Sequence, residues 1–130
     1  MEFDFPRWER LKKQKLIQQL FVQKQSIGAY PLRLFWLEMP PNADDAPICC
    51  QAAFAVPKKK FKRANRRNRI KRQMREIYRL NSHNLQDILT IKRRNLICLW
   101  FFAGSELPPF ELLKAKMLYL LDKLSIQFNQ

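Results

Sequence analysis

Acidic side chains are the first candidates for hydrolytic chemistry, because a nuclease that works alone needs metal-binding carboxylates or a general acid and base. The chain has 11 Asp and Glu residues, which are scattered along its 130 positions. The only adjacent pair, Asp44-Asp45, lies in a proline-rich stretch (residues 40–47) that predicts a surface loop. The carboxylates therefore favour a binding protein over a self-sufficient enzyme.

The other reactive side chains are also sparse. His83 is the single histidine, which cannot seed a zinc site by itself. Three cysteines stand in apolar surroundings without a Cys-x-x-Cys motif, which favours buried, reduced thiols: Cys49, Cys50 and Cys98. With only 2 glycines the chain has no Gly-rich phosphate loop. We expect the protein alone to hold no metal ion and to bind no small-molecule substrate.

One segment carries much of the positive charge. Between Lys58 and Arg72, ten of fifteen residues are Lys or Arg and none is acidic. The net charge of +14 exceeds what solubility needs and indicates a polyanionic partner. A membrane surface is the rival, but no apolar run approaches the roughly 20 residues of a membrane span, and residues 1–4 do not begin a signal peptide. We therefore expect a cytoplasmic nucleic-acid-binding protein that does not engage membranes.

The basic segment continues into an amphipathic helix. Its apolar residues follow the i, i+4, i+7, i+8 spacing of a buried stripe: Ile70, Met74, Ile77 and Tyr78. The opposite side is polar and cationic: Asn68, Arg72, Arg75 and Arg79. Five cations crowd the predicted start of this helix, where acids are normally favoured: Lys62, Arg63, Arg66, Arg67 and Arg69. A phosphate backbone would relieve their repulsion, so docking on nucleic acid is favoured over a merely solvated basic face.

The remaining patterns place this helix in a single domain, residues 1–130, with a loosely held lead-in at 1–9. Aromatic and apolar runs predict two strands, 30–39 and 48–56, which a loop joins as an antiparallel hairpin, and a continuously apolar run predicts a central strand at 94–103. Gly28 can end the segment after a first helix at 12–23, and 85–91 fits a helical turn or a loop. Further helices are expected at 64–80 and 110–128. The order is αββαβα, with room for an extra short strand in the hairpin region, which is an α/β two-layer sandwich.

A sheet with small exposed residues and nearby aromatic rings suits single-stranded RNA better than duplex DNA, because bases can stack on the rings while cations follow the phosphates. The chain shows neither dimerising heptads nor a helix-turn-helix pair, which disfavours a DNA-binding protein. The candidate rings are Phe21, Phe35, Trp36 and Phe54. Core packing is the alternative role for each of them.

The motif Arg67-Asn68-Arg69-Ile70-Lys71-Arg72-Gln73-Met74-Arg75-Glu76 resembles the signature of the bacterial ribonuclease P protein family. Val56-Pro57-Lys58-Lys59-Lys60 is similar to the strand end that precedes this signature, and Arg10-Leu11-Lys12-Lys13 with Leu20-Phe21 is similar to the family's first helix. The resemblance covers about residues 8–125. It implies an αβββαβα sandwich with a left-handed βαβ crossover, against the usual right-handed preference.

The resemblance also implies a function in tRNA processing. The chain would be the protein subunit of ribonuclease P, an endonuclease whose RNA subunit carries the chemistry. It would bind this ribonuclease P RNA and the 5′ leader of precursor tRNA, and promote phosphodiester hydrolysis that leaves a 5′-phosphate on the mature tRNA. Mg²⁺ would be held mainly by the RNA subunit. The alternative is a non-enzymatic structural RNA-binding protein of the ribosomal or assembly-factor type.

Carried over by position, the resemblance implies two sets of binding residues and no catalytic residue in this chain. The RNA subunit would be bound by Arg67, Asn68, Arg69, Lys71, Arg72 and Arg75, with Lys58, Lys59, Lys60, Lys62 and Arg63 leading to them. The leader of precursor tRNA would be bound by Ile17, Phe21 and Phe35. The chain departs from the family pattern at Ile17, where a second Phe is common, and at Phe61-Lys62, which replace a usual Gly beside a one-residue insertion. A further Gly is replaced around Lys24.

Overall fold

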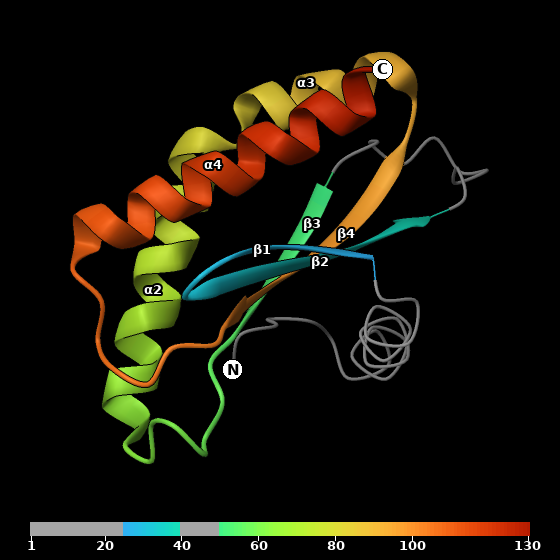
Figure 1. Ribbon diagram of the computed structural model, residues 1–130. Coiled ribbons are helices and arrows are strands. Elements are labelled where there is room, and N and C mark those ends of the chain that lie inside the picture. The colour runs from blue at the N-terminus through green and yellow to red at the C-terminus, as the bar shows by residue number, and fades with distance from the viewer. Residues whose placement is uncertain (1–24, 40–49) are drawn as a thin grey trace.

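The computed structural model describes residues 25–39 and 50–130 (Figure 1). Its elements are the strands β1 (Ser26–Ala29), β2 (Leu32–Met39), β3 (Cys50–Ala55) and β4 (Asn95–Phe102), and the helices α2 (Ala64–Asn81), α3 (His83–Lys92) and α4 (Phe110–Asn129). The predicted helix at 12–23, the lead-in and the Pro40–Pro47 loop lie outside the described residues. All the other predicted elements are present in their predicted order.

The four strands form one sheet in the order β1-β2-β4-β3. The expected hairpin between the second and third strands is wrong, because β4 lies between them. β4 pairs antiparallel with β2, from Leu32 opposite Phe102 to Met39 opposite Asn95, and parallel with β3. The central place that the apolar run predicted for β4 is confirmed: from Leu96 to Phe102 every residue is buried except the half-buried Phe101.

Two short elements complete the topology. β1 pairs antiparallel with β2, and the turn between them contains a cis Tyr30–Pro31 peptide bond. Gly28 pairs with Arg33, so it lies inside a strand and does not end a segment as expected. This is the third strand that the family pattern implies before the basic helix. The ambiguous stretch around residues 85–91 is helical and forms most of α3.

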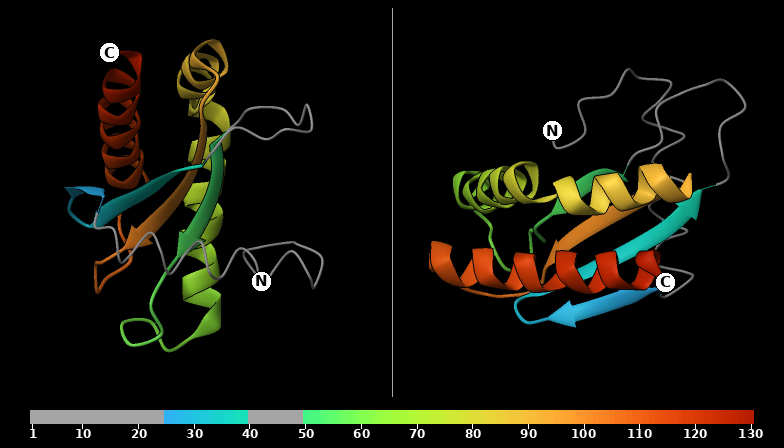
Figure 2. Two further views of the ribbon diagram at one scale, coloured as in Figure 1. Left: turned by 90° about the vertical axis from the view of Figure 1, so that its right-hand side faces the viewer. Right: turned by 90° about the horizontal axis from the view of Figure 1, so that it is seen from above.

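The connection from β3 to β4 runs through α2 and α3, and the two strands are parallel neighbours. Seen from the helix side, with β3 and β4 turned to point upward, β4 lies to the left of β3 (Figure 2, right). The crossover is therefore left-handed, as the family resemblance implies and contrary to the general preference for right-handed connections.

All three described helices cover the same face of the sheet, which gives two layers (Figures 1 and 2). Strand alternation sends Leu34, Trp36, Phe54, Trp100 and Phe102 into the core beneath them. The helices contribute a matching apolar set: Ile70, Met74, Ile77, Leu85, Leu89, Leu113, Met117, Leu120, Leu121, Leu124 and Phe128. The expected core helix at the C-terminal end is thus confirmed as α4.

The start of the edge strand β3 is held by side chains from the helix layer. Gln86 of α3 accepts a hydrogen bond from the Cys50 backbone N–H (2.9 Å) and donates one to the Cys50 carbonyl (3.2 Å). The hydroxyl of Tyr78 on α2 also donates to that carbonyl, over 3.3 Å. These bonds satisfy backbone groups at a sheet edge and fix β3 against α2 and α3.

Candidate nucleic-acid interface

The predicted two-sided character of the basic helix is confirmed in α2. Ile70, Met74 and Ile77 are buried to 1% exposure or less in the core beneath the helix. The opposite side of the helix is exposed and holds the polar and cationic residues that periodicity placed there: Asn68, Arg72, Arg75 and Arg79. Because the apolar stripe fixes the rotation of α2 about its axis, it also fixes the direction in which these arginines project.

The segment before α2, residues 58–63, will be called the basic loop. Its five cations are exposed: Lys58, Lys59, Lys60, Lys62 and Arg63. Phe61 interrupts them and points the other way, for it is only 4% exposed and its ring centroid lies 5.8 Å from that of Phe102. The Phe61 N–H also donates to the Pro57 carbonyl (3.3 Å). The aromatic residue that replaces the usual Gly therefore anchors the loop in the core.

Arg67 fastens the basic loop to the first turn of α2. Its Nη1 donates to the backbone carbonyls of Phe61 (2.6 Å) and Lys62 (3.1 Å). Arg67 is half-buried, in contrast to Arg66 and Arg69 in the same turn of the helix, which are exposed. The sequence predicts Arg67 as an RNA ligand, and in the structure its guanidinium makes hydrogen bonds within the protein.

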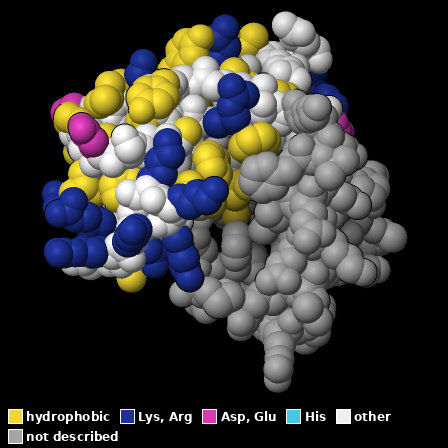
Figure 3. Space-filling view, turned by 60° about the horizontal axis from the view of Figure 1, so that its bottom comes forward, with side chains coloured by type: hydrophobic (Ala, Val, Ile, Leu, Met, Phe, Trp, Pro, Cys, Tyr) yellow, Lys and Arg dark blue, Asp and Glu magenta, His cyan; other side chains and the backbone are white. Residues whose placement is uncertain are grey.

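The expected RNA-subunit ligands lie along the basic loop and α2, where all are exposed except Arg67 and Lys71, which are half-buried. Figure 3 shows dark-blue Lys and Arg side chains gathered on one side of the molecule. No acidic residue lies in the first turn of α2, and its N-cap residue Arg63 makes no capping hydrogen bond through its side chain. We will call the basic loop and the exposed cations of α2 the basic surface.

Two of the described acids are engaged by arginines. Glu38 on β2 accepts a hydrogen bond from Arg94 Nε (2.8 Å) and a second one from Arg94 Nη2, and these bonds lower the pKa of Glu38. Glu76 accepts from Arg79 Nη2 (2.6 Å), which lowers the pKa of Glu76 and partly neutralises the last cation of the arginine row. Within residues 25–39 and 50–130, no cluster of three or more His, Cys, Asp or Glu side chains could hold a metal ion.

The aromatic candidates separate into two groups. Trp36 and Phe54 point into the helix-covered core, so the RNA-platform role is wrong for them. Phe35 lies half-buried on the other sheet face, edge-to-face with Phe101 at 6.4 Å between ring centroids. Phe101 was not anticipated, although its alternation with the buried Trp100 was the available signal. Ile17, Phe21 and the Asp44-Asp45 pair lie outside the described residues.

The thiol prediction is confirmed for the two cysteines that the structure describes. Cys50 on β3 and Cys98 on β4 are free and buried, with 3.0 Å between their Sγ atoms. Burial raises the pKa of Cys98, so its thiol stays protonated. Cys49 lies outside the described residues.

Among the helices of the described chain, none is long and apolar enough to cross a membrane.

Comparison with known proteins gives consistent results. A family model described as Ribonuclease P matches residues 5–124. The Ribonuclease P protein component of Porphyromonas gingivalis (strain ATCC 33277) is 31% identical over 115 residues, which cover 88% of this chain and 82% of the relative. That of Chlorobium phaeobacteroides is 31% identical over 125 residues, which cover 91% and 86%.

Solved structures agree on the fold. The RNase P protein from Thermotoga maritima aligns with a TM-score of 0.63 at 18% identity, over 85% of this chain and 92% of that one. The RNase P protein of Staphylococcus aureus aligns with a TM-score of 0.59 at 15% identity, over 84% and 88%. At these identities the two structures establish the architecture alone.

Proposed function

The chain belongs to the ribonuclease P protein family, and from this premise we propose that it binds ribonuclease P RNA through the basic surface and precursor tRNA through the aromatic sheet face. The complex removes the 5′ leader of precursor tRNA. The RNA subunit performs the phosphodiester hydrolysis, with Mg²⁺ that is held mainly by that RNA. The site of action is the cytoplasm.

The observation that carries this proposal is that the protein core holds the basic surface in place. Its cations stand on a helix with a fully buried stripe and on a loop with an aromatic anchor. A partner that presents phosphates at fixed positions, such as a folded RNA, benefits most from such a rigid array, because less order is lost on binding. Glu76, the acid on α2, is held by Arg79, which leaves phosphate oxygens as suitable counter-charges for the other cations.

The leader of precursor tRNA is the proposed ligand of the sheet face that carries Phe35. Single-stranded RNA is bound by stacking bases on aromatic rings while cations follow the backbone. Phe35 and Phe101 provide rings on that face, and strand register places Phe101 opposite Ala55, the last residue of β3. β3 leads into the basic loop, so a strand of RNA on this face would run toward the basic surface. Ile17 and Phe21 remain predicted members of this site.

A reconstitution assay tests the proposal. The purified protein should cut nothing alone, yet should let a bacterial ribonuclease P RNA process precursor tRNA at low Mg²⁺, where that RNA by itself is slow. A folded protein that stimulates no such RNA would refute the proposal.

The second candidate, a structural RNA-binding protein without a role in cleavage, is favoured by the basic surface alone. It predicts equal affinity for precursor and mature tRNA in the presence of the RNA subunit, whereas our proposal predicts preference for the precursor. Competition by duplex DNA at about 0.15 M salt separates both from a DNA-binding protein, since non-specific binding falls steeply with salt.

A further inference from the structure

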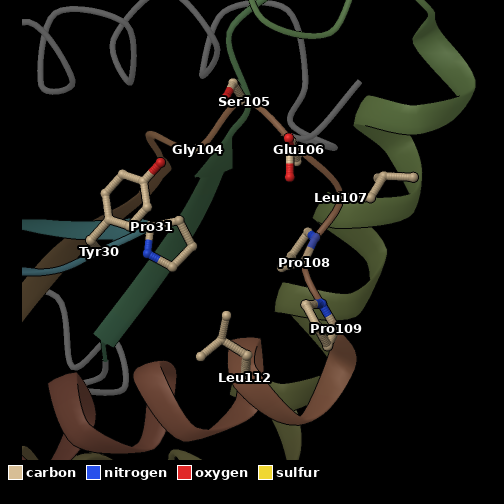
Figure 4. A pocket seen from close by; sticks show the side chains of 9 residues that line it. All are labelled: Tyr30, Pro31, Gly104, Ser105, Glu106, Leu107, Pro108, Pro109 and Leu112. Carbon is tan, nitrogen blue, oxygen red and sulfur yellow. The ribbon is translucent and has the colours of Figure 1, made fainter.

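A hollow of about 370 Å³ lies between the β1–β2 turn and the connection from β4 to α4 (Figure 4). One wall is formed by Tyr30 and Pro31 of the turn, and the other by the connection, residues 104–109, with Leu112 of α4 below. In Figure 4, Pro31, Pro108 and Leu112 face one another across the space. The hollow belongs neither to the arginine face of α2 nor to the Phe35 side of the sheet.

The two walls are tied together by the backbone. The Ala103 N–H donates to the Pro31 carbonyl over 2.7 Å. Gly104 passes so close to the turn that a Cβ atom there would lie 3.0 Å from Pro31 Cβ and 2.9 Å from the ring of Phe102. A side chain at position 104 would push the walls apart, so this glycine is required for the hollow to keep its shape.

Exposed apolar side chains gather around this hollow. Tyr30 is 73% exposed, the largest value among the large exposed aromatic residues that the structure describes. Leu107 and Leu112, which also line the hollow, are exposed as well. A cluster of exposed apolar groups marks a binding surface, and a flat ring beside prolines suits a flat ligand.

The charges around the hollow indicate what kind of ligand this is. Lys60 of the basic loop reaches its rim, where its Nζ donates to the Ala103 carbonyl over 3.2 Å. Glu106 of the connection also lines the hollow, and this residue is exposed. A phosphate is therefore attracted to Lys60 and repelled by Glu106, while a group that donates hydrogen bonds suits Glu106.

We propose that the hollow binds the base of one unpaired nucleotide of the RNA subunit, stacked on Tyr30, with its phosphate beside Lys60. The inference rests on the proposed function and adds a site beyond the basic surface. Each of the four bases has an N–H donor that can bond Glu106, so this contact does not select among them. The pocket is large enough for one base, and aromatic stacking also tolerates any base.

The test measures binding of the full-length protein to a bacterial ribonuclease P RNA, with chemical probing of the unpaired bases. Tyr30→Ala should weaken binding about 5- to 150-fold, the range for loss of one stacked base. Since Tyr30 is uncharged, the slope of log K against log salt should stay unchanged. One base that is protected by the wild type should become reactive in the Tyr30→Ala complex, and Tyr30→Phe should restore both affinity and protection.

Tyr119→Ala is the matched control, because Tyr119 is another exposed tyrosine and lies on α4 away from the hollow residues. It should leave affinity and protection unchanged. If Tyr30→Ala binds the RNA as tightly as the wild type while Arg72→Ala still binds more weakly, the pocket assignment is overturned. The proposed function would remain intact. A dimer in RNA-free solution that Tyr30→Ala dissolves would instead identify a second copy of the chain as the occupant and overturn the proposal.

Discussion

Replacing Arg67 by Gln tests whether the basic loop is preorganised by the protein itself. The substitution removes a guanidinium that donates to the carbonyls of Phe61 and Lys62. Hydrogen bonds from charged donors contribute about 1.5–3 kcal/mol when they are shielded from water. The bond to Phe61 is partly buried and the bond to Lys62 is exposed, so we assign about 2 kcal/mol to the pair.

Without these hydrogen bonds the loop should sample many conformations in the free protein, and only one of them is competent to bind the RNA. The affinity then falls in proportion to the population of that competent conformation. About 2 kcal/mol corresponds to roughly 30-fold weaker binding of the RNA subunit. The number of phosphates contacted in the complex does not change, because the exposed cations of the loop are still present. A plot of log K against log salt should therefore move down without a change in slope.

Amide hydrogen exchange supplies the independent measurement. The Phe61 N–H, which donates to the Pro57 carbonyl, should exchange faster in Arg67→Gln while the core of α2 keeps its protection. Phe61→Leu, which keeps an apolar anchor, should behave much more like the wild type. The reasoning is refuted if Arg67→Gln lowers the salt slope by about one and leaves Phe61 exchange unchanged, since Arg67 would then act as a phosphate ligand only.

Three further substitutions test other parts of the structure. Arg72→Ala, on the exposed side of α2, should weaken RNA-subunit binding and lower the salt slope by about one, whereas an unchanged slope would remove Arg72 from the phosphates. Phe35→Ala should reduce the preference for precursor over mature tRNA without changing the melting temperature by more than a few degrees; a large loss of stability would show that Phe35 serves the fold instead. Glu38→Gln should destabilise the protein at neutral pH in urea unfolding, because the hydrogen bonds from Arg94 lower the pKa of Glu38. That contribution to stability is present above the unfolded pKa of about 4.3 and is lost as the pH falls through the lower folded pKa. The free energies of unfolding of wild type and variant should therefore converge in acid. A difference that stays constant with pH would contradict the assignment.

Periodicity predicted the faces of the elements but not their neighbours. The stripe from Ile70 to Ile77 fixed which side of α2 is buried, and the apolar run of β4 fixed its central place. Chain order alone suggests that β2 pairs with β3. Instead β4 lies between them, although its first residue, Asn95, comes 40 residues after Ala55, the last residue of β3. Such a long-range pairing depends on which strand is apolar on both faces, which is a property of the whole sheet.

The candidate site shows the same division. Composition and spacing predicted the cations of the basic surface and their exposure. They did not predict that Phe61 is buried or that Arg67 turns inward, because a charge-rich segment favours full solvation for all of its members. The signal was a single aromatic residue among lysines, at a position where the family pattern has a Gly. A large apolar side chain in such a run has to be buried or bound, and here the ring of Phe102 receives it.

The burial of Phe61 also explains how a chain with a net charge of +14 can hold its cations in place before RNA arrives. Repulsion within the basic loop and the first turn of α2 favours spreading these residues apart. Opposing it are interactions that contain no counter-ion: an aromatic contact in the core, two carbonyl acceptors for Arg67, and a third carbonyl, that of Ala103, for Lys60. Backbone carbonyls satisfy the donors without neutralising the charge, so the field that the surface presents to phosphates is kept. Acidic partners would also stabilise the free protein, but the RNA would have to displace them on binding.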